Sequence, residues 1–314
     1  MESRKLILFG KNSFVISLPK SWVIGNKLKK GDMVYIEDRS PELAVLPSEI
    51  TSKEEQKKAI IEIQDKELGR IRSEIISAYL LNNGIIELIG ENMPENVKNI
   101  KNIIRDLSGL EIMNLTSKRI TAQVILNEEE VDLENLFRRV DMIVRSMISD
   151  SISTLKEDMY ENIQARDTDV NRLVWLSFRV VRKAMKNPGF AKKINMSNMD
   201  LLNYKNIVAE LEGIGDQAKR VARYVRKLKL NQKSQAEFHK LYSSLNELYL
   251  ETMKAYYKKD RELAFEVMGI SRKKNFEFNL FMEKNANIEV VFSIGFLKSM
   301  NSQIKEIARI ISAA

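Results

Sequence analysis

The stretch LLNYKNIVAELEGIGDQAKRVARYVRKL, residues 201–228, decides the fold class of this chain. Its apolar residues recur at i, i+3 and i+4, which is the spacing of one helical face, so it predicts a long amphipathic helix. Stretches with the same spacing fill the chain from residue 131 to its end. We therefore expect a mainly helical, multidomain protein with long helices over 133–157, 162–185, 201–228, 236–259, 260–285 and 287–314.

These helices form two sets of three, which indicates an internal repeat. The match is strongest between STLKEDMYENIQARD (153–167) and KAYYKKDRELAFEVMG (254–269), where Asp158 and Asp260 stand at equivalent helix starts. Within the first set, NPGF (187–190) breaks the second helix from the third. We predict two three-helix bundles that pack side by side, over 131–230 and 231–314.

Two acidic motifs lie on neighbouring helices of the first bundle. Glu212 and Asp216 are four residues apart, so they share one helix face. The two glycines between them cost roughly 1 kcal/mol each in helix propensity, which suggests that another helix or an ion approaches closely. Asp167 and Asn171 form a second oxygen pair at the same spacing, and facing carboxylates build multi-metal sites in bundles. The alternative is an ordinary solvated face, since this spacing is common.

Residues 51–130 have a mixed pattern that predicts a small α/β domain of β-α-β-α-β-β order. This segment has no glycine fingerprint at a strand-to-helix turn and no Ser/His pairing. We interpret it as a scaffold or a ligand-sensing insert. The expected elements are 59–63, 66–83, 84–90, 95–109, 110–117 and 119–126.

The first fifty residues read as short strands joined by turns, with one short helix near Pro19. Gly25 stands near the end of that helix, and Gly31 supplies the next turn. Such a segment is too small to bury a core, and its strand edges need a partner, so we expect a homodimer. The expected strands are 4–9, 13–18, 33–38 and 43–47.

Composition narrows the classes of function. The 314 residues include no Cys, which excludes disulfides and Cys-ligated zinc. They include a single His, His239, so we do not expect a His-based catalytic triad. No apolar run is long enough to span a membrane and the N-terminus does not resemble a signal peptide, so we expect a cytoplasmic protein without membrane insertion. The net charge is +8, and residues 1–30 carry seven basic side chains against Glu2, which suggests nucleic acid or an acidic partner. A second basic run, 219–230, we interpret as a solvated face.

ELEGIGDQAKRVARYV (210–225) resembles the signature of the PhoU family, in which a Glu-x-x-x-Asp segment recurs once per three-helix repeat. ARDTDVNRL (165–173) is similar to the companion segment on the preceding helix. In that family the two motifs gather iron, zinc or similar ions in a multinuclear cluster. The resemblance implies the ligands Asp167, Asn171, Glu212 and Asp216, with Asp169 as a neighbour.

The chain departs from that family pattern in two places. Asn171 stands where the family prefers Asp, which removes one negative charge. In the second repeat, GISRK (269–273) and KSMNS (298–302) replace both acidic motifs, and Lys298 takes the place of the Glu. We therefore expect at most one metal site, on the first bundle.

The opening segment, from Arg4 to Asp38, resembles the SpoVT/AbrB (MazE-like) swapped-hairpin domain in its turn glycine, its PKSW and its LKKGD. The resemblance implies an intertwined homodimer over residues 1–50 whose basic turn and first strand lie on DNA. It implies that Lys27, Lys29 and Lys30 solvate a turn. The DNA contacts that it implies are Arg4, Lys5, Lys11, Asn12, Ser13 and Lys20.

An AbrB-like domain, an α/β insert and PhoU-like repeats together resemble archaeal PhoU-type phosphate uptake regulators. The leading hypothesis is a dimeric, DNA-binding transcriptional regulator of phosphate homeostasis. The alternative is a signalling adaptor that docks on a phosphate transporter ATPase or a sensor kinase and uses the hairpin only to dimerise. An enzyme is not expected, because nothing pairs the carboxylates with a nucleophile or base.

Overall fold

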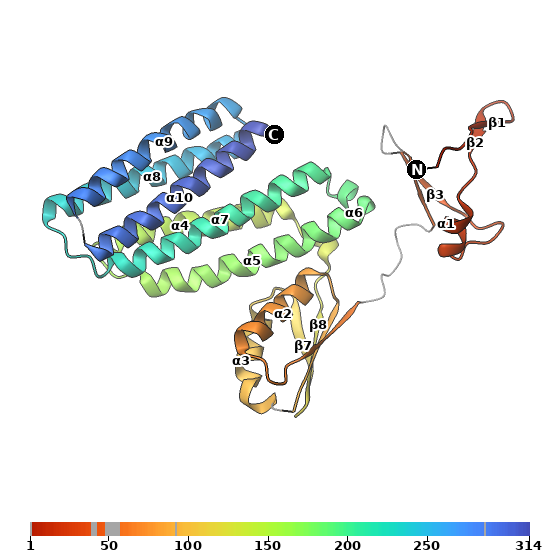
Figure 1. Cartoon of the computed structure of the whole chain (residues 1–314), viewed down its shortest axis with the longest axis horizontal. Helices are drawn as coiled ribbons and strands as arrows, with labels where there is room; N and C mark the ends of the chain where they lie inside the picture. Colours follow the sequence, from red (N-terminus) through yellow and green to blue (C-terminus); the bar gives the residue numbers. More distant parts are fainter. Residues whose placement is uncertain (1, 39–42, 48–56, 92, 286) are drawn as a thin grey trace. The chain divides into compact units, whose positions relative to one another are not determined.

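The computed structural model describes residues 2–38, 43–47, 57–91, 93–285 and 287–314 (Figure 1). The chain divides into two compact units, Met1–Glu55 and Gln56–Ala314. The first is a small unit of short strands, and the second holds an α/β domain and the long helices. The predicted divisions near residues 130 and 230 fall inside the second unit and stay predictions.

The first unit contains the strands and the short helix expected from its turns. Strands β1 (Ile7–Phe9) and β2 (Ser13–Val15) form an antiparallel hairpin, in which Leu8 pairs with Phe14. Helix α1 (Lys20–Gly25) follows, and strands β3 (Tyr35–Asp38) and β4 (Leu43–Leu46) form a second antiparallel pair. The hairpin turns at Gly10, whose φ of +68° is a conformation that favours glycine.

None of the described side chains in this first unit is buried. Phe9, Phe14 and Leu8 are each exposed by 60% or more of their surface. A two-stranded hairpin is marginal in water when no third element covers its apolar side chains. The described residues of this unit therefore form no core of their own within one chain.

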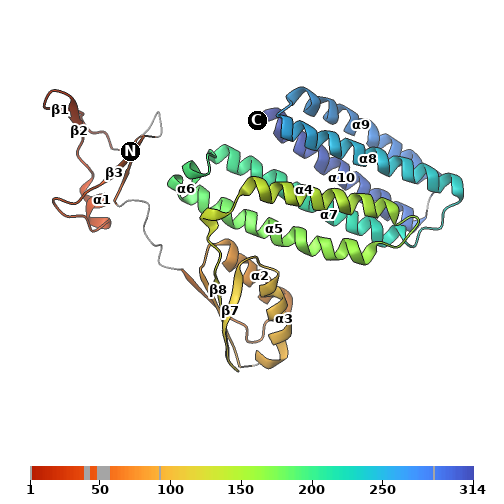
Figure 2. The ribbon, with the colours of Figure 1, turned by 180° about the vertical axis from the view of Figure 1, so that it is seen from behind.

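The α/β domain has the predicted β-α-β-α-β-β order. Its sheet runs β5-β6-β8-β7, with β5 and β6 parallel and the other pairs antiparallel. Helices α2 and α3 lie on the same side of the sheet in both views (Figures 1 and 2), and the core between them includes Ile75, Ile86 and Ile100. The elements are β5 (Lys58–Glu62), α2 (Leu68–Leu80), β6 (Ile85–Ile89), α3 (Met93–Arg105), β7 (Leu110–Leu115) and β8 (Arg119–Val124).

The described residues after β8 form a short 3-10 helix (Glu128–Glu130), six long α-helices and one short α-helix. The predicted break at NPGF is a short helix, α6, whose first turn contains Pro188 and is capped by the Asn187 side chain. Asp260 caps α9, and Asp158 accepts a hydrogen bond from the Tyr160 amide at the start of α5. The helices are α4 (Leu133–Ser153), α5 (Tyr160–Lys186), α6 (Pro188–Lys193), α7 (Asn198–Val225), α8 (Gln232–Lys258), α9 (Arg261–Lys284) and α10 (Ile288–Ala313).

The two three-helix sets share one hydrophobic core, which runs from α4 to α10. Helices α7 and α10 lie side by side at the junction of the sets (Figure 2). A buried carboxylate also joins the sets, because Asp141 on α4 accepts hydrogen bonds from Tyr249 (2.7 Å) and Tyr257 (2.8 Å) on α8. Arg145 on α4 completes this group with two bonds to Asp141, of 2.8 and 2.7 Å. The two sets thus pack against one another around a shared core.

A second buried group joins the α/β domain to the helices. Arg179 on α5 is 2% exposed, and its Nε donates to Glu128 at 2.8 Å. Its Nη1 donates to the backbone oxygens of Tyr79 and of Asn83, the latter at 3.2 Å, and the guanidinium lies 4.7 Å from the centre of the Tyr79 ring. Burial alone would raise the pKa of Glu128, but Arg179 and Lys183 outweigh it and lower that pKa. Among the described residues, no helix combines the length and apolarity that crossing a membrane requires.

Candidate functional site

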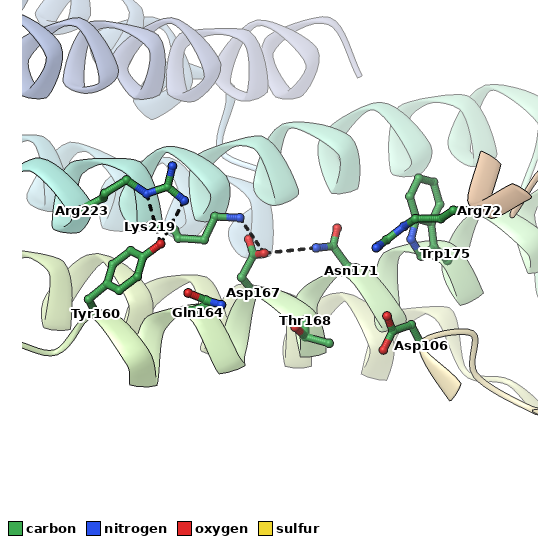
Figure 3. A pocket seen from close by; sticks show the side chains of 10 residues that line it. All are labelled: Arg72, Asp106, Tyr160, Gln164, Asp167, Thr168, Asn171, Trp175, Lys219 and Arg223. Carbon is green, nitrogen blue, oxygen red and sulfur yellow. Dashed lines mark hydrogen bonds and ion pairs between the residues drawn. The ribbon is translucent and has the colours of Figure 1, made fainter. Parts of the chain in front are cut away.

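The residues of both acidic motifs come together where α5 packs beside α7. Figure 3 shows the α5 motif, with Asp167 and Asn171, beside Lys219 of α7. Asp167 and Asn171 lie one turn apart on α5, and the Asn171 amide donates to Asp167 Oδ2 at 3.4 Å. On α7, Glu212 lies close enough to Asp216 and Asp167 for their negative charges to act on it. The helical spacing therefore predicted the neighbourhood of these four side chains.

Lys219 lies between the two aspartates of this group. Its ammonium is 2.7 Å from Asp167 Oδ2 on α5 and 2.9 Å from Asp216 Oδ1 on its own helix. The other oxygen of Asp216 is 2.5 Å from the guanidinium of Arg220. Lys219 is only 17% exposed, so the interpretation of 219–230 as a solvated face is wrong at this residue. The sequence signal was its position three residues after Asp216, which puts it on the acidic face.

The charges of this cluster act on one another through partly buried surroundings. Burial and then the charges of Asp216 and Asp167 raise the pKa of Glu212, and Lys219 and Arg220 offset only part of that rise. Burial alone would lower the pKa of Lys219, but its bonds to Asp167 and Asp216 outweigh it and raise that pKa. Lys219 therefore remains an ammonium, with a fixed positive charge between two carboxylates.

The two glycines of the α7 motif face other helices. A β-carbon at Gly213 would lie 1.9 Å from the side-chain nitrogen of Gln303 on α10. One at Gly215 would touch Met147 of α4 at 3.5 Å, which is ordinary van der Waals contact. The close approach that the glycines suggested is thus that of a helix.

The family pattern implies a metal cluster at these four residues, and the arrangement of their oxygens does not fit one. Oxygen ligands must converge on a shared ion, whereas Asp167 and Asp216 converge on Lys219. Both oxygens of Asp216 already lie beside a basic side chain. Within the part of the chain that the structure describes, no three acidic or histidine side chains are grouped as metal ligands.

The positions predicted to be equivalent in the second repeat lie on α9 (269–273) and on α10 (298–302), and they carry no acid. Lys298 donates to the side-chain oxygen of Asn279 on α9, and the Ser302 hydroxyl donates to the backbone oxygen of Lys298 at 3.1 Å. Nearby, Asn301 is buried and donates to the Ser271 backbone oxygen at 2.9 Å. These side chains join α9 to α10 by hydrogen bonds between neutral and basic groups.

A polar cavity of about 280 Å³ opens beside the ion pairs (Figure 3). At one end Arg223 donates to the Tyr160 hydroxyl from Nε (3.1 Å) and Nη2 (2.9 Å). At the other end lie Arg72 and Asp106 of the α/β domain. The remaining lining residues are Gln164, Asp167, Thr168, Asn171, Trp175 and Lys219.

The residues predicted to contact DNA are all exposed in the first unit. Lys11 and Asn12 form the turn between β1 and β2, and Ser13 is the first residue of β2. Lys20 is the first residue of α1. Arg4 forms an ion pair with Glu2, and Lys5 follows it before β1.

Residues 137–225 match the PhoU domain family, and this range runs from the second turn of α4 to the end of α7. It contains Asp167, Asn171, Glu212 and Asp216. Among solved structures, the crystal structure of PhoU from Pseudomonas aeruginosa is similar at 15% identity with a TM-score of 0.47, over 58% of this chain and 95% of that one. No curated protein matches this chain. The segment from α4 to α7 is thus similar to the PhoU domain.

Proposed function

We propose that this chain is a DNA-binding transcriptional regulator of phosphate uptake and homeostasis. The PhoU domain at 137–225 supports the regulatory role in phosphate homeostasis. The observation that carries the DNA-binding part is the first unit, a basic turn on a hairpin with no buried side chain. In this proposal the helical repeats sense phosphate status or dock a partner, the protein acts in the cytoplasm, and it catalyses no reaction.

Dimerisation through the first unit is part of the proposal. The apolar side chains of β1 and β2 are exposed on one chain, and an interleaved second copy would cover them. A swapped hairpin of this kind is the arrangement that the AbrB-like resemblance implies. It would present each basic residue twice on one face, which matches the two-fold symmetry of many operators.

The basic turn suits contact with DNA phosphates. Lys11 and Lys20 supply charge, and backbone amides of the turn at Gly10 add donors. Asn12 and Ser13 are short side chains beside the turn that can donate to and accept from base edges. Arg4 and Lys5 extend the basic surface toward the N-terminus.

Genome-wide mapping of the DNA contacts of the full chain tests the proposal. We expect enrichment upstream of phosphate-uptake genes, with an occupancy that differs between phosphate-rich and phosphate-starved cells. A matched strain whose protein carries Lys11→Ala and Lys20→Ala should lose the enrichment. Equal maps from the two strains would contradict the DNA-binding role.

A second candidate function is an adaptor that docks on a phosphate transporter ATPase or a sensor kinase. Exposed aromatic side chains on α9 favour it, because Phe276 is 72% and Phe265 is 49% exposed. Co-purification of the transporter ATPase with the wild-type chain, and its loss with Phe265→Ser and Phe276→Ser, would support the adaptor. The Lys11→Ala, Lys20→Ala protein should still co-purify it.

A further inference from the structure

Lys219 supplies a positive charge at the place where the acidic motifs converge. Its ammonium contacts one oxygen of Asp167 and one of Asp216, and these two aspartates belong to different helices. A cation that bridges carboxylates from α5 and α7 is the role that a metal ion has in carboxylate bundles. Here the bridging cation belongs to the chain itself.

The surrounding groups complete the charge balance without a further ion. Arg220 contacts the second oxygen of Asp216, and Asn171 donates its amide hydrogen to Asp167. An amide that donates to the carboxylate turns its positive edge toward the place where a metal would sit. A divalent ion at this position would have to displace the ammonium of Lys219 and lie next to Arg220.

We propose that Lys219 is a built-in counter-cation that replaces the metal ion at this site, so that the α5–α7 contact forms independently of metal. The proposal does not depend on DNA binding. It makes the acidic motifs structural groups that join two helices. Among the described residues, Asp167, Glu212 and Asp216 are not grouped around one point in this structure, and in this proposal they turn toward a shared divalent ion only when the ammonium is removed.

Calorimetric titration of the chelator-treated full chain with Mn²⁺, and separately with Zn²⁺, tests this inference. We expect no saturable binding at the cluster in the wild type. Lys219→Met should gain one saturable site per chain where the wild type shows none, because the ligand charges are no longer neutralised. Adding Glu212→Gln and Asp216→Asn to Lys219→Met should remove the gain.

The matched control is Arg223→Met, which removes a positive charge from the same cavity but leaves Asp167 and Asp216 on Lys219. Like the wild type, Arg223→Met should show no saturable binding of Mn²⁺ or Zn²⁺. A gain of metal binding in Arg223→Met equal to that in Lys219→Met would overturn the proposal, because the effect would then be one of net charge.

Two further results would overturn it. One is saturable Mn²⁺ or Zn²⁺ binding by the wild type that disappears in Asp216→Asn. The other is a folded Lys219→Met protein, as judged by circular dichroism, that gains no site. If Lys219→Met does not fold, Lys219→Gln takes its place.

The wild type also provides a test without substitution. Its thermal midpoint of unfolding should be equal in chelator and in millimolar Mn²⁺, whereas a bound ion would raise that midpoint.

Discussion

At the residue scale, the same residue type has different roles at different helix positions. Gly213 lies against Gln303 of α10, whereas Gly269 on α9 has no neighbouring atom within 4 Å of the place where a β-carbon would be. Both positions are helical. Helix propensity favours alanine over glycine equally at both, so packing alone separates them.

We expect Gly269→Ala to raise the free energy of unfolding by about 1 kcal/mol, since it adds helix propensity and meets no obstacle. Gly213→Ala should raise the free energy of unfolding little or not at all. The added β-carbon forces the Gln303 side chain away and disturbs the hydrogen bond that Gln303 makes with Glu210. Urea denaturation of the two variants measures the difference. In a Gln303→Ala background, Gly213→Ala should raise the free energy of unfolding by about 1 kcal/mol relative to Gln303→Ala alone, because no Gln303 side chain then meets the β-carbon. Equal stabilisation by the two single variants would mean that α10 does not approach closely at Gly213.

At the element scale, the β1–β2 hairpin is the element on which the proposed DNA binding depends. Its turn carries Lys11 and Asn12, and its strands offer apolar side chains to a partner. Lys29 lies outside the hairpin, after α1, and the resemblance implies that it solvates a turn. The two lysines therefore form a matched pair for an electrostatic test.

A dimer presents Arg4, Lys5, Lys11 and Lys20 twice, which makes eight positive charges. If about half of these charges contact DNA phosphates, a plot of the logarithm of DNA affinity against the logarithm of salt concentration should have a slope of roughly −3 to −4. Lys11→Ala should flatten that slope by nearly two, at about 0.9 per lost contact and two contacts per dimer. Lys29→Ala should leave it unchanged. Fluorescence anisotropy of one labelled duplex at several salt concentrations measures all three slopes. Identical slopes for wild type and Lys11→Ala would place the turn away from phosphates.

At the scale of the whole molecule, the buried Glu128–Arg179 pair joins the α/β domain to the helices. Removing Arg179 leaves Glu128 with Lys183 alone in a site where it is 9% exposed. Arg179→Met should therefore lower the free energy of unfolding by about 3 kcal/mol, and Glu128→Gln in the same chain should restore part of it. Trp175 lies on α5 against the α/β core, so its fluorescence reports the junction, with Trp22→Phe as background.

The same pair predicts a pH dependence. Because the pKa of Glu128 is lower in the folded chain than its ordinary value of 4.5, its charge stabilises the fold above that pH. This contribution is lost as the pH falls below about 4.5 and Glu128 becomes protonated in the folded state. Glu128→Gln should remove that part of the acid sensitivity, measured as the change in urea midpoint between pH 7 and pH 4. An unchanged acid sensitivity in Glu128→Gln would contradict the assignment.

The division into two units predicts that they separate cleanly. Removing residues 1–55 should leave a folded chain, because the second unit has its own cores, but one that no longer self-associates. Light scattering of the full and shortened chains measures this, and circular dichroism confirms that the shortened chain keeps its helices. A shortened chain that dimerises as tightly as the full one would place the interface on the helical repeats.

The sequence by itself determined the elements, their order and which side chains of each acidic motif share a helix face. Apolar spacing along 201–228 specified helix α7, and a short apolar run bounded by glycines at 84–90 specified strand β6. Glu212 and Asp216 had to share a face because four residues make about one helical turn. These properties depend on neighbours only a few residues away, so a local pattern is enough to predict them.

Only the tertiary structure decided what those faces meet. Lys219 meets Asp167 because α5 lies beside α7, and Gly213 meets Gln303 because α10 packs on the same helix. Arg179, which a helical pattern would assign to any polar face, is buried because the α/β domain covers that part of α5. The partner of a side chain depends on which distant segments pack together, and that choice is made by burial of the whole core, which no short stretch of sequence contains.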